Sequence, residues 1–457
     1  MKKIVFYAHK WHYISYFEPV FAECEKRKIN FDILIVYPRD DTYLKYARKY
    51  SRNLVEPLYQ NRLARTFFNP YSLPVPSALK PFVTYAAQAL YFKHIFLRLF
   101  QKNKYEILVV SDDRAILPCV ALSAAKALGL KTILFPGETI LYVEDFLADR
   151  YAAAASPPTL KKRILSYLSK RLYPQNTAIY LDKELHHTPP RKIVSLFPFQ
   201  LFPRNPWIRG ANRNTDISAV GSDMQKVLDC ARGASPENIY ASGFPPHDRL
   251  YDIVKNKKYK RKDLMNTFGL AHKKIFLILG THHIAERSDF IDQTDSASYE
   301  NETNQALRAV TDTLGDEYIY LFKIHPQKNL QEQKQALSDD LRDKIVLLKN
   351  EYDTYELIAQ SDAMLNFMSS ATIAAFATNM PIFCYYLLKK SSSTHNWKER
   401  FRSIVQLDSI EELKDALFKL KKNTPIYEDF QARRIFDRIN YGKYDGRSAE
   451  RFVALLD

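Results

Sequence analysis

The feature that most constrains the fold is the alternation of short apolar runs with amphipathic segments, which recurs in both halves of the chain. The predicted strands are residues 3–7, 31–37, 107–111, 131–136, 216–221 and 239–243 in the first half, and 274–280, 318–324, 345–348, 363–367 and 382–386 in the second. Helical patterns separate them. Strands that alternate with helices form parallel, doubly wound sheets. The chain is therefore predicted to be α/β, with doubly wound parallel sheets in two domains.

The 457 residues are too many for one hydrophobic core. The predicted parts are an N-terminal domain with basic helical insertions, a linker, a C-terminal domain, and a terminal helix that packs back on the N-terminal domain. Their boundaries are 1–254, 255–267, 268–438 and 439–457. The linker prediction depends on the basic, polar stretch from Lys255 to Lys262.

Cysteine spacing and apolar runs bear on the compartment. The four cysteines form no C-x-x-C pair, which indicates a reducing compartment and no zinc ribbon. The apolar run at the N-terminus is too short for a signal peptide. The longest uncharged stretch, 363–388, contains polar residues and a proline, and is interpreted as strand, loop, helix and strand rather than a membrane span. We expect a cytoplasmic protein, peripheral at the inner face of the cytoplasmic membrane.

The net charge of +16 is unevenly distributed. Residues 57–105 and 150–181 contain no Asp or Glu and mix basic residues with aromatic and leucine side chains. Basic amphipathic helices of this kind suit an anionic membrane surface, although each could equally be the solvated face of an ordinary helix. Nucleic acid is not an expected partner, because no helix-turn-helix, zinc-finger or RNP signature accompanies the charge.

Two short motifs in the second half indicate a phosphate site. His325-Pro326 ends the apolar run 318–324, and Ser369-Ser370-Ala-Thr372 follows the run 363–368. Open α/β sheets bind ligands at the carboxyl ends of their strands. The hydroxyl cluster also opens a predicted helix over 373–377, whose free N–H groups could hold a phosphate. No glycine-rich phosphate loop is present, so side chains and helix termini must bind the phosphate.

A third loop, Thr281-His282-His283, follows the first predicted strand of the second domain. It fits a phosphate or base contact better than a metal site, because it lacks the H-E-x-x-H pattern. No metal and no cofactor are expected, the nucleotide-sugar being a co-substrate. The predicted nucleotide- or phosphate-binding residues are His325, Pro326, Ser369, Ser370, Thr372, Thr281, His282 and His283.

Three loops at strand ends in the first half could supply the catalytic acid or base that sugar transfer needs. They are residues 9–12, 111–113 and 136–138. Glu138 is the first candidate, His12 the second and Asp113 the third. Asp112 and Asp113 could instead cap the predicted helix 115–128.

The order of elements resembles a GT-B glycosyltransferase, in which two Rossmann-like domains face a cleft, on the strength of residues 238–250, 323–326 and 361–370. The resemblance implies that the N-terminal domain is a Rossmann-like acceptor domain and the C-terminal domain a Rossmann-like nucleotide-sugar domain. The His-Pro and Ser-Ser pair is similar to bacterial sialyltransferases, Kdo and capsule-polysaccharide transferases, and CDP-glycerol glycerophosphotransferases. That resemblance implies that His325, Ser369 and Ser370 contact the phosphate of a cytidine nucleotide. The tail 441–451 is similar to the ending of UDP-N-acetylglucosamine 2-epimerases and of the CDP-glycerol enzymes.

The chain also departs from these families. CDP-glycerol enzymes usually carry Asp-Tyr before the Ser-Ser, whereas this chain has Asn366-Phe367-Met368, which argues against that donor. The acidic motif of sialyltransferases ends in glycine, but Arg114 follows the acidic pair here and Gly137 precedes Glu138. Ser-Ser-Ala also replaces the Ser-Gly-Gly of the epimerase phosphate loop.

The predicted function is that of a metal-independent glycosyltransferase in polysaccharide, lipopolysaccharide or capsule synthesis. The favoured donor is a CMP-linked acidic sugar such as sialic acid or Kdo, and the acceptor a surface glycan or glycolipid. The alternatives are a CDP-glycerol-type glycerophosphotransferase, a UDP-sugar transferase, a UDP-sugar 2-epimerase, and a non-catalytic membrane or nucleic-acid binder.

Overall fold

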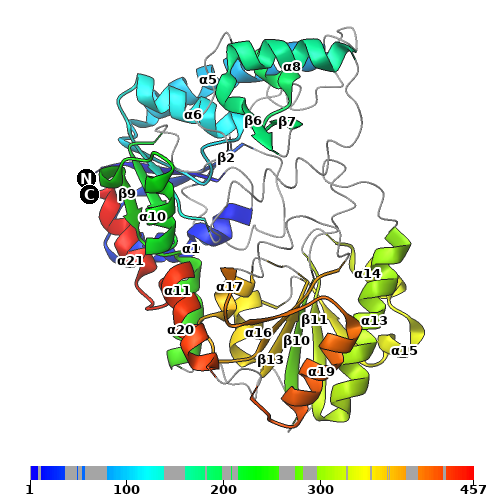
Figure 1. Ribbon diagram of the computed structural model, residues 1–457. Coiled ribbons are helices and arrows are strands. Elements are labelled where there is room, and N and C mark those ends of the chain that lie inside the picture. Colours follow the sequence, from blue (N-terminus) through cyan, green and yellow to red (C-terminus); the bar gives the residue numbers. More distant parts are fainter. Residues whose placement is uncertain are drawn as a thin grey trace. The chain divides into compact units, whose positions relative to one another are not determined.

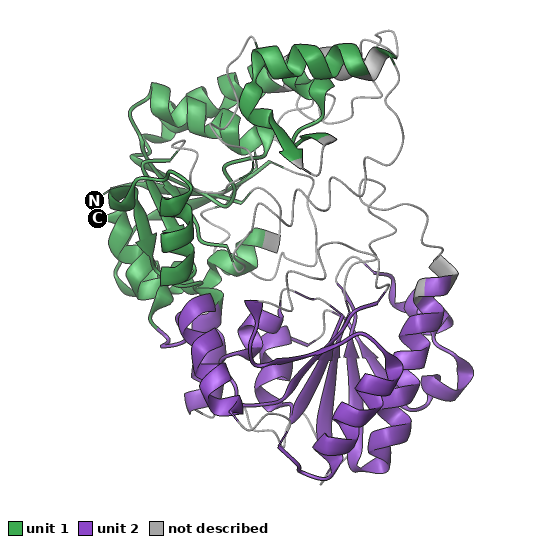
Figure 2. Cartoon of the chain, in the orientation of Figure 1, with its two compact units in different colours: residues 1–246, 447–457 green, residues 247–446 purple. Residues whose placement is uncertain are grey.

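The computed structural model divides the chain into two compact units, residues 1–246 with 447–457 and residues 247–446 (Figure 2). We call these unit 1 and unit 2 and describe each by itself. The structure describes residues 2–8, 12–36, 49, 54–56, 80–137, 160–180, 183–197, 207, 215–256, 273–280, 296–325, 328–349, 352–367, 369, 371–387, 400–425 and 429–457.

Unit 1 is built on a parallel sheet of seven strands in the order β3-β2-β1-β4-β5-β8-β9 (Figure 1). The strands are β1 Ile4–Ala8, β2 Phe31–Ile35, β3 Leu54–Val55, β4 Ile107–Val110, β5 Lys131–Leu134, β8 Ile217–Val220 and β9 Ile239–Ala241. The strand order reverses between β1 and β4, which is the position where doubly wound folds bind ligands.

Helices cover both faces of this sheet. The helices of unit 1 are α1 His12–Lys26, α5 Lys80–Asn103, α6 Ile116–Ala127, α8 Leu160–Leu172, α9 Pro190–Leu196, α10 Asp223–Ala231 and α21 Ser448–Val453, of which α8 packs against α9 and the hairpin of β6 Thr177–Tyr180 and β7 Lys183–His186. Because side chains alternate along a strand, neighbouring residues of β1 serve opposite faces. Phe6 packs in the cluster formed with α1 and α21, whereas Tyr7 packs in the cluster formed with α5 and α6.

Unit 2 is built on a parallel sheet of six strands in the order β12-β11-β10-β13-β14-β15. The strands are β10 Lys274–Leu279, β11 Tyr318–Lys323, β12 Ile345–Leu348, β13 Ala363–Asn366, β14 Ile382–Tyr385 and β15 Ile404–Leu407. The helices are α11 Pro246–Asn256, α13 Ser296–Leu314, α14 Leu330–Ala336, α15 Asp339–Arg342, α16 Thr354–Gln360, α17 Thr372–Ala375, α19 Ile410–Lys421 and α20 Phe430–Tyr441. The order reverses between β10 and β13, as it does between β1 and β4 in unit 1.

The predicted fold class is confirmed, since both sheets are parallel with Rossmann-like strand orders. Each predicted strand is present, with ends shifted by at most two residues. The sequence patterns did not identify β3, β15 or the antiparallel hairpin of β6 (Thr177–Tyr180) and β7 (Lys183–His186). The boundaries proposed at 254, 268 and 438 stay a prediction; α11 runs through Asn256, and residues 257–267 lie outside the described residues.

The C-terminal residues 447–457 belong to unit 1. Phe452 of α21 is fully buried, and its ring lies 5.2 Å from that of Phe135 at the end of β5. The last segment of the chain thus fills the core of the first unit. Within the described ranges, no helix combines the length and the apolar character needed to cross a bilayer.

We expect Phe452→Ala to destabilise unit 1 by about 3–5 kcal/mol, because it removes a buried ring and leaves a cavity. Phe418→Ala is the control, since Phe418 lies on α19 with 49% of its surface exposed. Urea unfolding followed by tryptophan fluorescence compares the two variants. Equal midpoints for both variants would show that the C-terminal segment does not support unit 1.

Candidate functional site

Three adjacent strands of unit 2 end together. The middle strand, β10, pairs in parallel with β11 and β13, so that Leu279 lies beside both Lys323 and Asn366. His325 lies two residues beyond the end of β11, Gly280 directly follows β10, and Ser369 lies three residues beyond β13. The structure therefore places these three segments at one edge of the sheet, next to the point where the strand order reverses.

His325 leaves this edge in a fixed turn. Ile324 extends the β11 pairing, because its N–H donates to the carbonyl of Leu348 at 2.9 Å. The carbonyl of His325 then accepts from the N–H of Lys328, also at 2.9 Å. The imidazole is half-buried, and it has contacts in the structure. Pro326 lies outside the described residues.

Gly280 allows the end of β10 to lie close against the end of β11. A Cβ atom at this position would lie 3.0 Å from the ring of Phe322 and 3.4 Å from the carbonyl oxygen of Lys323. The Gly280 N–H donates to that same carbonyl at 2.9 Å. The next residues, Thr281, His282 and His283, lie outside the described residues, so their role stays a prediction.

Asn366 holds the turn that carries Ser369. Its side chain is fully buried; Nδ2 donates to the carbonyl of Phe383 at 3.0 Å, and Oδ1 accepts from the Ser369 N–H at 3.3 Å. An ionised Asp could accept from Ser369 but offers no proton to the Phe383 carbonyl. Asn at this position is therefore explained by the fold of the turn, without reference to the donor.

Thr372 is the first residue of α17 and is fully buried. Among the described residues, none hydrogen-bonds its Oγ1. Buried hydroxyls in proteins are nearly always paired, so this atom is an unusual feature of the site. Ser370 lies outside the described residues.

The helix that follows is shorter than the sequence indicates. We predicted a helix through Ala377, but α17 ends at Ala375. Beyond it, the N–H groups of Phe376 and Ala377 donate three residues back, to Ile373 and Ala374 at 3.2 and 3.1 Å. Four residues produce only a small macrodipole. A phosphate at this edge would therefore depend on hydroxyl and turn N–H donors.

A buried arginine donates hydrogen bonds to the backbone carbonyls at and beyond the C-terminal end of α17. Arg434 of α20 is fully buried, and its guanidinium donates to the carbonyls of Ala375, Thr378 and Met380 at 2.9–3.1 Å and to Ser403 Oγ at 2.9 Å. Burial lowers its pKa to about 10, so it keeps its charge at neutral pH. A charged donor is well suited to carbonyls left free at a helix end.

Arg438, one helical turn further along α20, extends the same contact. It donates to the carbonyls of Phe376 and Thr378 at 2.5 and 2.8 Å and to Oδ1 of Asn379 at 2.8 Å. We call Arg434 and Arg438 the arginine pair. It supplies side-chain donors where the short helix leaves carbonyls unpaired. Sequence spacing gave no indication of it beyond two arginines four residues apart.

Two segments that supported the family resemblance meet beside α17. Tyr444, in the tail 441–451, donates to the carbonyl of Ile373 at 2.7 Å, and its ring stacks on His247 with 5.2 Å between centroids. His247, in the stretch 238–250, is 1% exposed. Arg249 from that stretch pairs with Asp353, the N-cap of the neighbouring α16, and with Glu356 of α16 at 3.2 and 2.7 Å. Both segments thus support the site structurally.

The three candidates for the acid or base follow adjacent strands of unit 1. His12 comes after β1, Asp113 after β4 and Glu138 after β5, around the reversal of strand order. Asp113 is fully buried, and its backbone carbonyl accepts from Cys119 Sγ at 3.3 Å. The side chain of His12 and the whole of Glu138 lie outside the described residues. All three stay predictions.

The alternative interpretation of the acidic pair, as helix caps, was wrong. α6 begins at Ile116, and its N-cap residue, Ala115, makes no side-chain capping bond. Asp112 instead accepts from the N–H of Arg114 at 2.7 Å, two residues on, in a local turn.

A metal site is a separate question. Among the residues that the structure describes, no group of three or more His, Cys, Asp or Glu side chains could hold a metal ion.

Replacing Asn366 tests its role in the turn. Asn366→Ala leaves the Phe383 carbonyl and the Ser369 N–H unpaired, and we expect a loss of about 1–3 kcal/mol. Asn366→Asp should also destabilise at pH 7.5, but less at pH 5. The protonated carboxyl can donate to the carbonyl, so its pKa in the folded state is raised and the stability it contributes is lost as pH rises. Thermal midpoints at both pH values measure this; a deficit that does not shrink on acidification contradicts the assignment.

Arg434→Met keeps most of the side-chain volume but removes the donors to three carbonyls and a hydroxyl. We expect a loss of at least about 3 kcal/mol in the free energy of unfolding, because those buried groups are left unpaired. Arg433→Met on the same helix is the control, since the contacts of Arg433 with Asp429 and with the Arg402 carbonyl lie at the surface, and their loss should cost less than about 1 kcal/mol. Similar urea midpoints for the two variants would contradict this role.

Comparisons with known proteins identify the family and the fold of this chain. The profile of the CDP-glycerol:poly(glycerophosphate) glycerophosphotransferase family matches residues 208–456, which include all of unit 2. No curated protein sequence matches the chain. The matched range contains both the His-Pro and the Ser-Ser motifs. The resemblance expected to the sialyltransferases and Kdo transferases finds no support, and the one expected to the CDP-glycerol enzymes does.

Solved structures show the same fold at low sequence identity. The chain is similar to UDP-GlcNAc 2-epimerase from Neisseria meningitidis bound to UDP-GlcNAc, with a TM-score of 0.59, 10% identity, and coverage of 100% of this chain and 99% of that chain. It is similar to a putative UDP-N-acetylglucosamine 2-epimerase from Listeria monocytogenes, with a TM-score of 0.58, 13% identity, and coverage of 100% and 96%. It is also similar to the wall teichoic acid polymerase TagF, with a TM-score of 0.53, 14% identity, and coverage of 100% and 88%. Since the family profile spans more than half of its length, the chain belongs to the CDP-glycerol:poly(glycerophosphate) glycerophosphotransferase family.

Proposed function

We propose that this chain transfers glycerophosphate, or a closely related polyol phosphate, from a CDP-linked donor to an acceptor hydroxyl. The donor phosphates would bind at the shared edge of β11, β10 and β13. One observation carries the proposal: His325 and the Ser369 turn follow the two strands that flank β10, within the range that matches the family. This donor replaces the CMP-linked acidic sugar that we favoured from the sequence.

The reaction makes clear demands on the site. The acceptor oxygen forms a bond to the phosphorus that carries the glycerol, the bridging bond of the diphosphate breaks, and CMP leaves. The acceptor proton passes to a base. The negative charge that grows on the leaving phosphate must be met by fixed donors. His325 is suited to donate there, and Ser369, Ser370 and Thr372 can donate hydroxyl hydrogen bonds.

The environment of Thr372 supports this assignment. A hydroxyl that is buried without a partner costs folding free energy, and a phosphate oxygen of a bound donor would provide the acceptor. The pairing of Asn366 with Ser369 keeps the neighbouring turn in place before the donor binds. Preorganised donors of this kind stabilise developing charge without having to reorganise.

The acceptor side remains assigned to unit 1. Glu138, His12 and Asp113 are proposed as the groups from which the base is drawn, because they follow three adjacent strands around the reversal of strand order. A poly(glycerophosphate) acceptor is anionic, and the protein's net charge of +16 favours its approach. We propose that the reaction needs no metal ion or cofactor besides the nucleotide-linked donor.

The test combines binding with turnover. We expect CMP and CDP to raise the thermal midpoint of the wild-type protein more than UDP or GDP, by an amount that grows with ligand concentration. His325→Ala should lose this shift and slow release of CMP from CDP-glycerol by about 10²–10⁴-fold. His94→Ala is the matched control, because His94 lies exposed on α5 of unit 1 and should change neither quantity.

The outcomes separate the alternatives. A shift that is selective for UDP, or turnover of a UDP-sugar without acceptor, would overturn the CDP-linked donor in favour of a UDP-sugar transferase or epimerase. No shift with any nucleotide would overturn the binding site itself.

A further inference from the structure

The structure distinguishes the two basic segments that the sequence presents as alike. On α5, which lies in 57–105, the aromatic residues Phe92, Phe96 and Phe100 are at most 1% exposed and pack with Tyr7 of β1. The apolar side of this helix is thus used in the core of unit 1. The interpretation of α5 as an ordinary helix with a solvated basic face is the better one.

Helix α8, in the segment 150–181, shows the opposite arrangement. Leu160, Ile164, Tyr167 and Leu168 are 75%, 53%, 59% and 39% exposed. Their spacing of four, seven and eight residues places them along one side of the helix. We call these four residues the α8 stripe. Soluble proteins seldom leave contiguous apolar surface uncovered, and such surface usually marks an interaction site.

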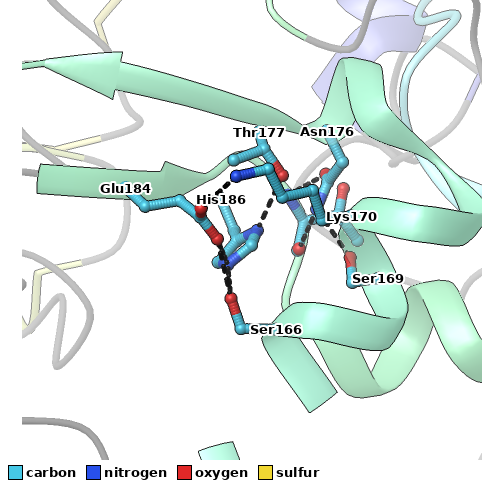
Figure 3. A network of polar contacts seen from close by, with 8 residues as sticks. Ser166, Ser169, Lys170, Asn176, Thr177, Glu184 and His186 are labelled. Carbon is cyan, nitrogen blue, oxygen red and sulfur yellow. Dashed lines mark hydrogen bonds and ion pairs between the residues drawn. The ribbon is translucent and has the colours of Figure 1, made fainter. Parts of the chain in front are cut away.

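The other side of α8 is already occupied by polar contacts with the β6–β7 hairpin (Figure 3). Ser166 Oγ lies 2.6 Å from His186 Nε2, and Lys170 Nζ lies 2.7 Å from Glu184 Oε2. Asn176 donates to Ser169 Oγ at 3.4 Å, and Ser169 is fully buried. These bonds fix the rotation of the helix about its axis, so the stripe must face away from the hairpin.

The same network is built to stay in place at neutral pH. Burial lowers the pKa of His186 below its ordinary value, so the ring is neutral. Burial alone would raise the pKa of Glu184, but hydrogen bonds from Lys170 and Ser166 outweigh it and lower the pKa, so the carboxylate stays ionised. A neutral imidazole and a paired carboxylate leave the basic residues of α8 as the dominant charge on this surface.

The charged residues of α8 itself are all positive. Over its 13 residues α8 contains no Asp or Glu but five basic residues, Lys161, Lys162, Arg163, Lys170 and Arg171. Arg163 is exposed, and the guanidinium of Arg171 lies 5.9 Å from the ring centroid of Tyr167 and 3.3 Å from its hydroxyl. An aromatic ring stacked with an arginine suits the region between lipid headgroups and acyl chains.

We propose that the α8 stripe binds an anionic lipid bilayer, with the helix lying in the plane of the interface. The four apolar side chains would enter the acyl boundary while Arg163 and Arg171 contact lipid phosphates. Apolar area together with flanking cations is the combination that holds such helices on anionic membranes. The inference uses no part of the nucleotide site and does not depend on the identity of the donor.

Flotation of the full-length protein with phosphatidylcholine vesicles, with and without phosphatidylglycerol, tests this. We expect binding only when phosphatidylglycerol is present. The triple variant Leu160→Ser/Ile164→Ser/Tyr167→Ser should bind at least about tenfold more weakly, because the transfer of even one large apolar side chain is worth that factor. The control Ile435→Ser/Ile439→Ser removes two residues, 52% and 66% exposed on α20, and should bind as wild type.

A second pair of substitutions tests the charge. Arg163→Gln/Arg171→Gln should weaken binding to the anionic vesicles about tenfold or more, and added salt should reduce wild-type binding in the same direction. The substituted side chains of α8 are all exposed, and unchanged thermal midpoints verify that each variant is folded.

Three results would overturn the proposal. The first is wild-type protein that floats with neither kind of vesicle, or equally with both. The second is a triple variant that floats like wild type. The third is a triple variant that changes only the oligomeric state in sedimentation, which would make the stripe a contact between copies of this chain.

Discussion

The parallel pairing of β10 with strands on both of its sides is the interaction on which the candidate site depends. Parallel strands must run in one direction, so β11, β10 and β13 deliver the residues that follow them to one edge of the sheet. His325 and Ser369 are 44 positions apart in the chain, and only this pairing places both at the same edge. The strand order reverses beside them, which is the position where doubly wound folds bind ligands.

The site also needs a polar interior that is fully paired. α17 is too short to satisfy its own backbone, and its carbonyls and those of the following turn are instead met by Arg434, Arg438 and Tyr444. Buried charge of this kind is costly to desolvate, and it is retained here because each guanidinium finds several acceptors at once. The C-terminal quarter of unit 2 thus serves to hold a segment that carries the Ser-Ser motif.

Two helices of unit 1 have similar composition but pack differently. α5 and α8 are both basic and rich in large apolar residues, yet α5 turns its aromatic residues into the core, whereas α8 directs an apolar stripe outward. The difference arises from what each helix packs against. The sheet offers α5 an apolar face, while the β6–β7 hairpin offers α8 serine, histidine and carboxylate partners. Amphipathic patterning alone cannot distinguish these cases, because it reports two faces and not which one is covered.

The sequence by itself determined the fold class, the parallel strands and the polar residues at their ends, because strand and helix periodicity is a local property of the chain. The resemblance to the CDP-glycerol enzymes could also be recognised from short motifs, although the CMP-linked acidic sugar that we favoured as donor was not supported. Tertiary structure decided the rest. Asn366 as a support for Ser369, the arginine pair behind α17, and the exposure of the α8 stripe all depend on contacts between residues distant in sequence or on which face is buried. The spacing of residues along the sequence does not predict such contacts, because they form only when the elements pack and every buried polar group must find a partner.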